Sequence, residues 1–238
     1  MSEEKQAATK AAGSEAPDGR PDGSPAPKKA RKRGPIAAAV VAAVVIIAGA
    51  GLWVWHEQPS FCAAICHIPM DPYLETYDEE AGVAGHDKWM NDVSNTDSML
   101  AVTHRVAGEA CMDCHVPTLA EQVSELGAWV SGDYVYPLYE ADLDQLTEAS
   151  GMDADEFCLK SGCHVTASGE ALTTREQLKE ATADLSFNPH VAQHGERACS
   201  DCHKGHRASV MVCSECHDEA QLPDGWITPD EEDQLVIR

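Results

Sequence analysis

The chain has 238 residues, with 17 Lys and Arg against 40 Asp and Glu, and its formal net charge at pH 7 is −23. Such an acidic chain is a poor partner for nucleic acid, whose phosphates carry the same sign of charge. Aromatic residues make up only 5% of the chain, whereas ten cysteines and eleven histidines are present, so the informative pattern is carried by cysteine and histidine.

Residues 1–35 are rich in Ala, Gly, Pro, Ser, Glu and Lys and have almost no large apolar side chains. A segment of this composition cannot bury enough apolar surface to offset its chain entropy, so we expect a disordered tail. Eight of the 17 basic residues lie in it, which leaves nine basic residues against 35 of the 40 acidic residues in the rest of the chain. This acidity steers a basic docking face or, the reading we favour, keeps the domain soluble.

Ile36–Trp55 is a run of twenty residues without a charge. As a helix rising about 1.5 Å per residue it spans about 30 Å, the hydrocarbon core of one bilayer. Basic residues crowd its N-terminal flank, so the positive-inside rule puts the N-terminus in the cytoplasm and the chain after Trp55 on the outer, periplasmic side. The small residues Gly49 and Gly51 permit close helix pairing and hence a homo-oligomer.

A cleaved signal peptide is the alternative interpretation of this apolar run. The run is too long for an ordinary signal sequence, and no small-x-small cleavage site lies at a suitable distance before His56. We therefore expect an uncleaved, single-pass anchor in the cytoplasmic membrane.

Five copies of a cysteine–histidine pattern account for all ten cysteines. Three have the form C-x-x-C-H, the attachment signature of c-type haem, in which two thiols hold the haem covalently and the next histidine binds its iron. Two have wider spacings, with three and four residues between the cysteines. The predicted attachment residues are Cys62 and Cys66, Cys111 and Cys114, Cys158 and Cys163, Cys199 and Cys202, and Cys213 and Cys216, and the iron-binding histidines that follow them are His67, His115, His164, His203 and His217.

Disulfides and structural zinc are the alternatives for so many cysteines. A disulfide framework explains an even number of cysteines but not the histidine that follows each pair. Structural zinc needs two cysteine pairs, or one pair and two spaced histidines, around one tetrahedral ion. The repeated pattern therefore predicts five covalently bound c-type haems.

The haems are expected to form most of the hydrophobic core after His56, so little regular structure is needed. Helical spacing of apolar residues predicts a helix over Thr118–Val130, and two more helices are expected over Asp142–Ser150 and Thr173–Leu185. No run alternates long enough to indicate a sheet. The predicted fold is mostly α: a haem-packed multihaem cytochrome c domain with short helices and long loops, plus one N-terminal transmembrane helix.

The predicted organisation has four parts. These are a disordered cytoplasmic tail (1–35), a transmembrane signal-anchor helix (36–55), an extracytoplasmic pentahaem cytochrome c domain (56–217) and an acidic C-terminal tail (218–238).

The far ligand of each iron must come from outside the motifs. A lone histidine is more often a surface residue than a ligand, but up to five irons in a short domain each need a sixth ligand. We predict His104, His190 and His206 as far ligands, retain His86 and His194 as candidates, and leave out His56 at the membrane boundary.

Met70 follows His67 by three residues and is the further candidate ligand, for the first haem. A thioether ligand raises the potential of a haem relative to two histidines. The alternative is a methionine that fills a gap in the core.

Three stretches resemble the NapC/NirT/NrfH family of membrane-anchored multihaem quinol dehydrogenases. Cys62–Tyr73, with a methionine after the haem histidine, is similar to the first motif of that family. Thr103–Pro117 contains C-M-D-C-H-V-P and resembles the second, and His190–Ala208, which contains D-C-H-K-G, resembles the last. With the anchor, the likeness covers about Ile36–Ala208.

The resemblance implies that the protein takes electrons from menaquinol or another quinol and passes them along the haems. Its partners would be the quinol pool and an extracytoplasmic terminal reductase of anaerobic respiration, for nitrite or nitrate or of the flavin type. The family's quinol site lies beside the first haem with a lysine and an aspartate. Asp113 matches the family's aspartate and is nominated as a catalytic residue, the first acceptor of the quinol protons. Lys88 is nominated as the catalytic lysine.

The chain also departs from the family pattern. The first motif has one extra residue between its thiols, and the segment between Met70 and His104 is longer than in the family. The four-residue spacing between Cys158 and Cys163 is typical of small cytochromes of the c3 type. The fifth motif exceeds the four-haem plan, and we expect it to carry the exit haem.

Two other functions use the same anchor and haems. One is a tethered electron-transfer protein without its own quinol site. The other is a haem reductase in which one iron lacks a far ligand and is open to substrate.

Overall fold

The apolar run forms one long helix, α1 (Gly34–His56), in this computed structural model, which describes residues 34–65, 67–136, 139–191 and 193–237. Its 23 residues contain no acidic or basic side chain before His56. It is the one helix among the described residues that is long and apolar enough to cross a membrane, which is consistent with an anchor or a signal sequence. The predicted tail, 1–35, lies almost wholly outside the described residues.

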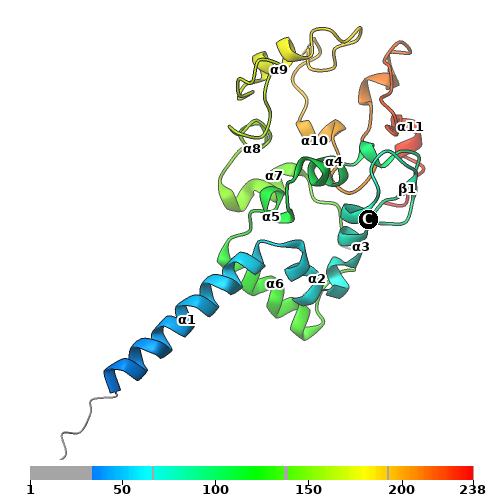
Figure 1. Cartoon of the computed structure of the whole chain (residues 1–238). Helices are drawn as coiled ribbons and strands as arrows, with labels where there is room; N and C mark the ends of the chain where they lie inside the picture. Colours follow the sequence, from blue (N-terminus) through cyan, green and yellow to red (C-terminus); the bar gives the residue numbers. More distant parts are fainter. Residues whose placement is uncertain (1–33, 66, 137–138, 192, 238) are drawn as a thin grey trace, which may run out of the picture. The chain divides into compact units, whose positions relative to one another are not determined.

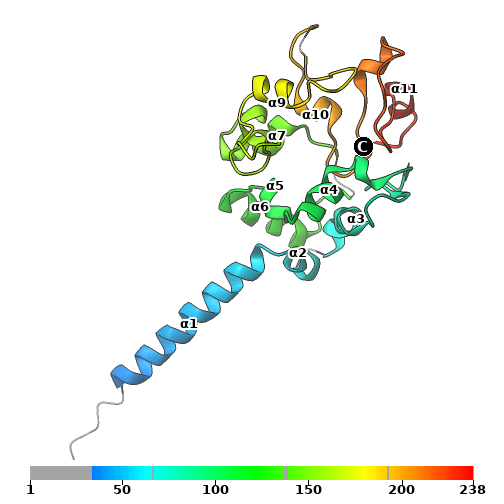
Figure 2. The same cartoon turned by 45° about the horizontal axis from the view of Figure 1, so that its top comes forward.

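Residues from Ile47 onward form a unit of their own, which carries the motifs and is called here the motif domain. Its elements are short and joined by long loops, as Figures 1 and 2 show. The helices and helical turns are α2 (Pro59–Ile65), α3 (His67–Asp78), η1 (Thr96–Ser98), α4 (Leu100–Ala107), α5 (Cys111–Cys114), α6 (Leu119–Ser131), α7 (Leu143–Thr147), η2 (Glu148–Ser150), α8 (Ala154–Cys158), α9 (Arg175–Ala181), α10 (Cys199–Cys202), η3 (Val212–Glu215) and α11 (Pro229–Glu232).

The mostly helical fold with short helices is confirmed. The predicted helix Thr118–Val130 is α6, whose N-terminus is fixed by a capping box: the Thr118 hydroxyl accepts from the backbone N–H of Glu121 at 3.3 Å, and the Glu121 carboxylate accepts from the backbone N–H of Thr118 at 2.7 Å. Gly132, in a left-handed conformation with φ 74°, ends it.

The other two predicted helices are present with different lengths. Asp142 caps α7, and a 3-10 turn, η2, continues it to Ser150. The helix expected over Thr173–Leu185 is only α9, Arg175–Ala181, because the Thr182 hydroxyl bonds to the Leu178 carbonyl at 2.8 Å and to the Asn188 side chain at 3.1 Å, where the chain turns away.

The only sheet in the described ranges is a hairpin of two-residue strands, β1 (Gly85–His86) and β2 (Asp92–Val93). Beside it lies a small apolar core formed by Val93, Met99, Val102 and Ala208, against which Ala81 and Ile227 pack.

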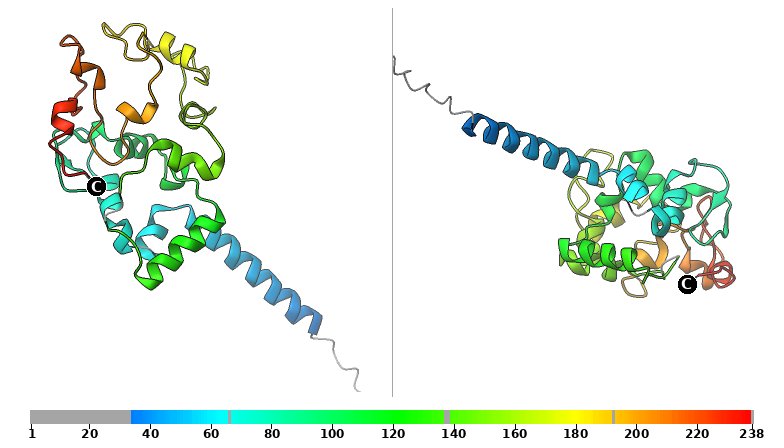
Figure 3. Two further views of the ribbon diagram at one scale, coloured as in Figure 1. Left: turned by 180° about the vertical axis from the view of Figure 1, so that it is seen from behind. Right: turned by 90° about the horizontal axis from the view of Figure 1, so that it is seen from below.

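The C-terminal segment packs on the motif domain near the hairpin, as the views in Figures 1 and 3 agree. Ile227 donates its N–H to the Ser209 carbonyl at 3.0 Å and accepts from Met211 at 2.9 Å. The Asn91 side chain pairs with the backbone of Val236 through two hydrogen bonds, of 3.0 and 3.1 Å. These hydrogen bonds hold the acidic C-terminal segment to the hairpin loop and to the residues that follow His206 in the chain.

Candidate functional site

The attachment cysteines lie on single helical turns. Cys111–Cys114 is α5 and Cys199–Cys202 is α10. Residues three apart share one helix face, so both sulfurs of each pair face the same side. In both turns an aspartate caps the N-terminus, because Asp113 Oδ2 and Asp201 Oδ2 each accept from the backbone N–H three residues earlier, at 2.7 and 3.2 Å. The aspartate of the C-x-D-C pattern therefore has a structural role in shaping the turn.

Three of the other predicted attachment residues lie in helices or a helical turn. Cys62 lies in α2, Cys158 ends α8 and Cys213 lies in η3, while Cys66 lies outside the described residues. All described cysteines are free thiols. Within the described part of the chain, no three His, Cys, Asp or Glu side chains converge as a structural zinc site requires.

Four motif histidines each face a histidine from outside the motifs. The ring centroids are 6.4 Å apart for His115 and His206, 6.1 Å for His164 and His104, 6.4 Å for His203 and His190, and 6.0 Å for His217 and His194. Two imidazoles that bind one metal from opposite sides through bonds of about 2.0 Å place their centroids roughly 6 Å apart. The residues present therefore fit haem irons with two histidine ligands.

The histidines in these pairs are held by hydrogen bonds at Nδ1. His104 Nδ1 donates to the Leu100 carbonyl at 2.8 Å. His206 Nδ1 lies 2.7 Å from the Thr76 hydroxyl, which itself lies 3.0 Å from the Tyr73 carbonyl, to which it donates. His190 Nδ1 lies 3.1 Å from the Thr182 hydroxyl. A proton fixed on Nδ1 leaves Nε2 with the lone pair that binds a metal.

Electrostatics also favours neutral imidazoles here. Burial, followed by the nearby His115 and Lys88, lowers the pKa of His206 to about 3. Burial lowers the pKa of His203 to about 4, with smaller contributions from His190, His164 and His104. Metal ligation requires the neutral ring, so both histidines are already in the binding form at neutral pH.

The pairing could not be read from sequence spacing. His206, three residues after His203, faces His115 of the second motif, because the loop Lys204–Arg207 crosses to α3 and α4. Leu100 and Ala101 donate their N–H groups to the carbonyls of Lys204 and Gly205, both at 2.9 Å.

The remaining candidate ligands are His194, His86 and Met70. His194 faces His217 and so joins the three predicted far ligands. His86 lies in β1, half-exposed, with Nε2 3.4 Å from Asp92. His56 packs edge-on against Phe61 at 4.9 Å. Met70 is half-buried in α3, which begins at His67, a residue whose side chain the structure does not describe.

Successive motifs lie next to one another. The Cys111 thiol hydrogen-bonds to Cys62, which lowers the pKa of Cys62 to about 7, and Cys158 and Cys199 make a similar contact. Lys160 Nζ donates to the Asp113 carbonyl at 2.8 Å and joins the second motif to the third. The N–H of Val210 donates to the Cys202 carbonyl at 2.8 Å, three residues before Cys213. The motifs thus form a contiguous series in chain order.

A pocket of about 240 Å³ opens between α3 and the hairpin loop. It is lined by Pro72, Glu75, Asp87, Lys88, Trp89, Met90, Tyr136 and Val236. Lys88 Nζ lies 4.3 Å from the Trp89 ring and 5.3 Å from the Tyr73 ring, and its backbone N–H donates to the His206 carbonyl at 3.1 Å. Burial lowers the pKa of Lys88, partly offset by Glu140. The structure does not bring Asp113 into this pocket.

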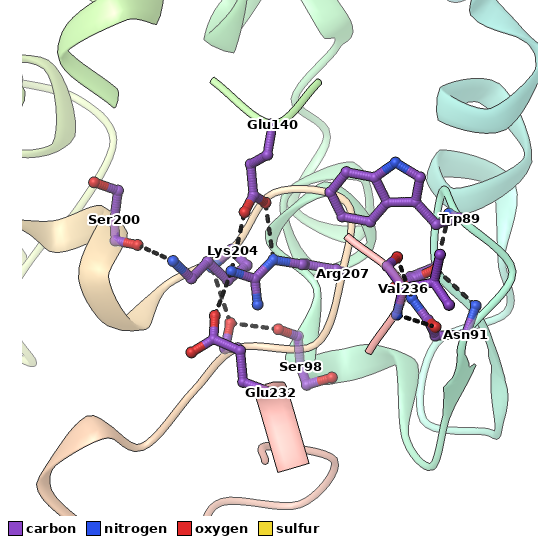
Figure 4. A network of polar contacts seen from close by, with 11 residues as sticks. Trp89, Asn91, Ser98, Glu140, Ser200, Lys204, Arg207, Glu232 and Val236 are labelled. Atoms are coloured by element: carbon purple, nitrogen blue, oxygen red, sulfur yellow. Dashed lines mark hydrogen bonds and ion pairs between the residues drawn. The ribbon is translucent and has the colours of Figure 1, made fainter. Parts of the chain in front are cut away.

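A buried ion-pair network holds the loop that carries His206, as Figure 4 shows. The Arg207 side chain, 2% exposed, bonds to both carboxylate oxygens of Glu140 at 2.8 and 3.1 Å and to Glu232 at 2.6 Å. Although burial alone would raise the pKa of Glu140, its hydrogen bonds with Arg207 lower it. Sequence reasoning missed this network because Glu140 and Glu232 lie 67 and 25 residues from Arg207 along the chain.

Comparison with known proteins places these features among cytochromes. A family model described as cytochrome c3 matches residues 144–218. The cytochrome c-type protein Cgr1 of Eggerthella lenta is 60% identical over 201 residues, which cover 84% of this chain and 90% of that protein. The probable fumarate reductase Ifc3 of Shewanella frigidimarina is 40% identical over 42 residues, 18% of this chain and 7% of that protein. No solved structure matches.

Replacing His206 by Ala tests the ligand pairs. We expect unchanged haem content, because the cysteines hold the haems, but a new high-spin signal in the electron paramagnetic resonance spectrum from the one haem that loses a ligand. His86→Ala is the control and leaves the spectrum unchanged. A fully low-spin spectrum of the His206→Ala protein contradicts the pairing of His206 with His115.

Replacing Glu232 by Gln tests the ion-pair network. We expect the free energy of unfolding to fall by about 1–3 kcal/mol, because the buried Arg207 loses a charged partner. Asp230→Asn, an exposed change on the same helix, is the control.

For Glu140→Gln we expect a pH-dependent loss. The folded-state pKa of Glu140 is lowered. The ionised carboxylate therefore stabilises the fold at pH values above the usual carboxyl range, and this stabilisation is lost as the pH falls through the folded-state pKa. Denaturation of both proteins at neutral and acidic pH measures this, and a pH-independent difference contradicts it.

Proposed function

The chain is a multihaem c-type cytochrome and belongs to the family of the cytochrome c-type protein Cgr1. From this premise we propose that it is a membrane-anchored quinol dehydrogenase. In this proposal it oxidises menaquinol or a related quinol and passes the electrons to an extracytoplasmic terminal reductase. The observation that carries the proposal is the pocket lined by Lys88, next to the paired histidines His115 and His206.

Five haems are proposed, one for each motif. When bound, they supply one-electron redox centres. The chain's own part is to hold them, with cysteines for attachment, four facing histidine pairs for the irons, and an Nδ1 hydrogen bond that orients several of the rings. For the first haem, His67 and Met70 remain the proposed ligands.

The pocket suits a quinol headgroup in size and chemistry. Ligand sites are mostly apolar with a few placed polar groups. Pro72, Met90 and Val236 supply apolar wall, and the Lys88 ammonium supplies a charged donor. α3 links the pocket to the first motif, since it begins at His67, while Lys88 contacts His206 directly. The resemblance of the motifs to the NapC/NirT/NrfH family supports the same assignment.

The membrane anchor is proposed to be α1. It is long and apolar enough to span a bilayer, and the basic run Lys28–Arg33 before it favours a cytoplasmic N-terminus. The haem domain then lies on the outer side.

Electrons are proposed to leave from the fifth motif toward a reductase. This motif ends the contiguous series, and His194 is exposed. The likeness of a 42-residue stretch to part of a probable fumarate reductase supports a reductase as the partner, of the flavin type or one for nitrite or nitrate.

Two other functions were open from the sequence. A tethered electron-transfer protein without a quinol site is the second candidate, and the use of Asp113 as a helix cap favours it. A haem reductase needs an iron with an open position. Every motif histidine whose side chain is described faces a second histidine, which disfavours that role.

Quinol-dependent haem reduction in membrane vesicles tests the proposal. We expect fast reduction, followed at the haem α-band, that is blocked by the quinone-site inhibitor heptyl-hydroxyquinoline N-oxide (HQNO). Reduction by dithionite but not by menaquinol would leave a tethered electron carrier.

Replacing Lys88 by Met tests the pocket. We expect kcat/KM for quinol to fall roughly 10- to 100-fold, because a charged hydrogen bond to the headgroup is lost. Lys179→Met, at an exposed position outside the pocket, is the matched control and keeps the wild-type rate. Equal rates in both variants would remove Lys88 from the site.

A further inference from the structure

The hairpin loop Asp87–Asn91 is built to present its side chains to the pocket. Asp87 Oδ1 accepts from the backbone N–H groups of Trp89 and Asn91 at 2.8 and 2.9 Å, and Oδ2 accepts from the Asn91 side chain at 2.7 Å. Met90 adopts φ 68°, the only positive φ of a residue other than glycine in the described chain. Strain of this kind persists where the surroundings enforce it and gathers at ligand sites.

Trp89 carries a donor without an acceptor. The side chain is 9% exposed, and its Nε1–H is buried with no hydrogen-bond partner in the described structure. Leaving a buried N–H unpaired costs free energy, and native proteins rarely do so. Because Trp89 lines the pocket beside Lys88, an occupant of the pocket can supply the missing acceptor.

Glu75 is the carboxylate of the pocket that is free to take a proton. Of the described lining residues only Asp87 and Glu75 are acidic, and Asp87 is committed to three hydrogen bonds of the loop. Glu75 projects from α3 and lies near the phenol of Tyr136, whose pKa is raised by burial first and then by Asp71 and Glu75.

We propose that Trp89 Nε1 donates a hydrogen bond to one oxygen of the quinol headgroup and that Glu75 accepts the proton from a quinol hydroxyl. This rests on the quinol dehydrogenase function proposed above. Oxidation of quinol to quinone breaks two O–H bonds and releases two protons and two electrons. One proton goes to Glu75 and on to water, the other to water through the pocket mouth, and the electrons go to the covalently attached haems.

The place of the pocket fits this chemistry. The Tyr73 ring meets the His206 ring edge-on at 5.2 Å and lies under Lys88, so a headgroup beside Lys88 is one aromatic ring away from the His115–His206 pair. A general base in hydrogen-bond reach of the reacting hydroxyl contributes roughly a hundredfold or more to the rate. A donor to the oxygen, in contrast, acts mainly on binding.

Two variants of the full-length holoprotein separate these roles. With Trp89→Phe we expect the Kd for HQNO to rise about three- to tenfold, while Trp89→His, which keeps a ring N–H, recovers part of the loss. With Glu75→Gln we expect kcat to fall about a hundredfold, loss of the acidic limb of the pH–rate profile, and unchanged Kd for HQNO.

Val106→Leu, at an exposed position on α4, and Asp78→Asn, on α3 outside the pocket, are the controls, and both behave as wild type. Wild-type behaviour of Trp89→Phe and Glu75→Gln in a protein that oxidises quinol overturns this inference alone. Absence of quinol oxidation and of HQNO binding in the wild type overturns the proposed function with it.

Discussion

The structure depends on one constraint: a haem iron with two histidine ligands needs two imidazoles from opposite sides. One imidazole comes with the attachment motif, so the other must be brought from elsewhere in the chain. Each pair therefore ties two segments together, as His104 ties α4 to the third motif. The apolar core that the chain builds for itself is small, centred on Met99 and Val102. The histidine pairs and the haems they fit take the place of a larger core, which explains why short helices and long loops suffice.

The segment Lys204–Arg207 shows how this constraint organises the domain. It leaves the fourth motif, hydrogen-bonds to the start of α4, delivers His206 to His115 and ends at the buried Arg207. Two carboxylates from distant segments neutralise Arg207, and one of them, Glu232, belongs to the acidic C-terminal segment. A buried guanidinium is costly unless it is paired, so the ion pairs fix where the C-terminal segment lies. The acidity of the C-terminal segment thus has a local use.

The sequence allows prediction of those features that depend on residues close together in the chain. The helix over Thr118–Val130 and the long apolar helix depend on residues a few positions apart, and the sequence predicts both of them. The pairing of His206 with His115 could not, because it depends on the path of a loop. The pocket could not either, because Glu75, Trp89 and Val236 are far apart in the sequence. Asp113 shows the converse: a family pattern suggests a proton acceptor, while the local geometry uses the carboxylate as a helix cap.

Helix capping and proton transfer make opposite demands on a carboxylate. A cap works only while one oxygen of the group stays fixed against a backbone N–H, as Asp113 Oδ2 is at 2.7 Å. A proton acceptor must gain and lose a proton in each turnover without unfolding its surroundings. Asp87 fails this test because its oxygens hold the hairpin loop, and Asp113 fails it because it holds the haem-attachment turn. Among the described residues, the Glu75 carboxylate makes no hydrogen bond that holds an element of the fold, so of these three carboxylates it is the one that can change its charge without breaking such a bond.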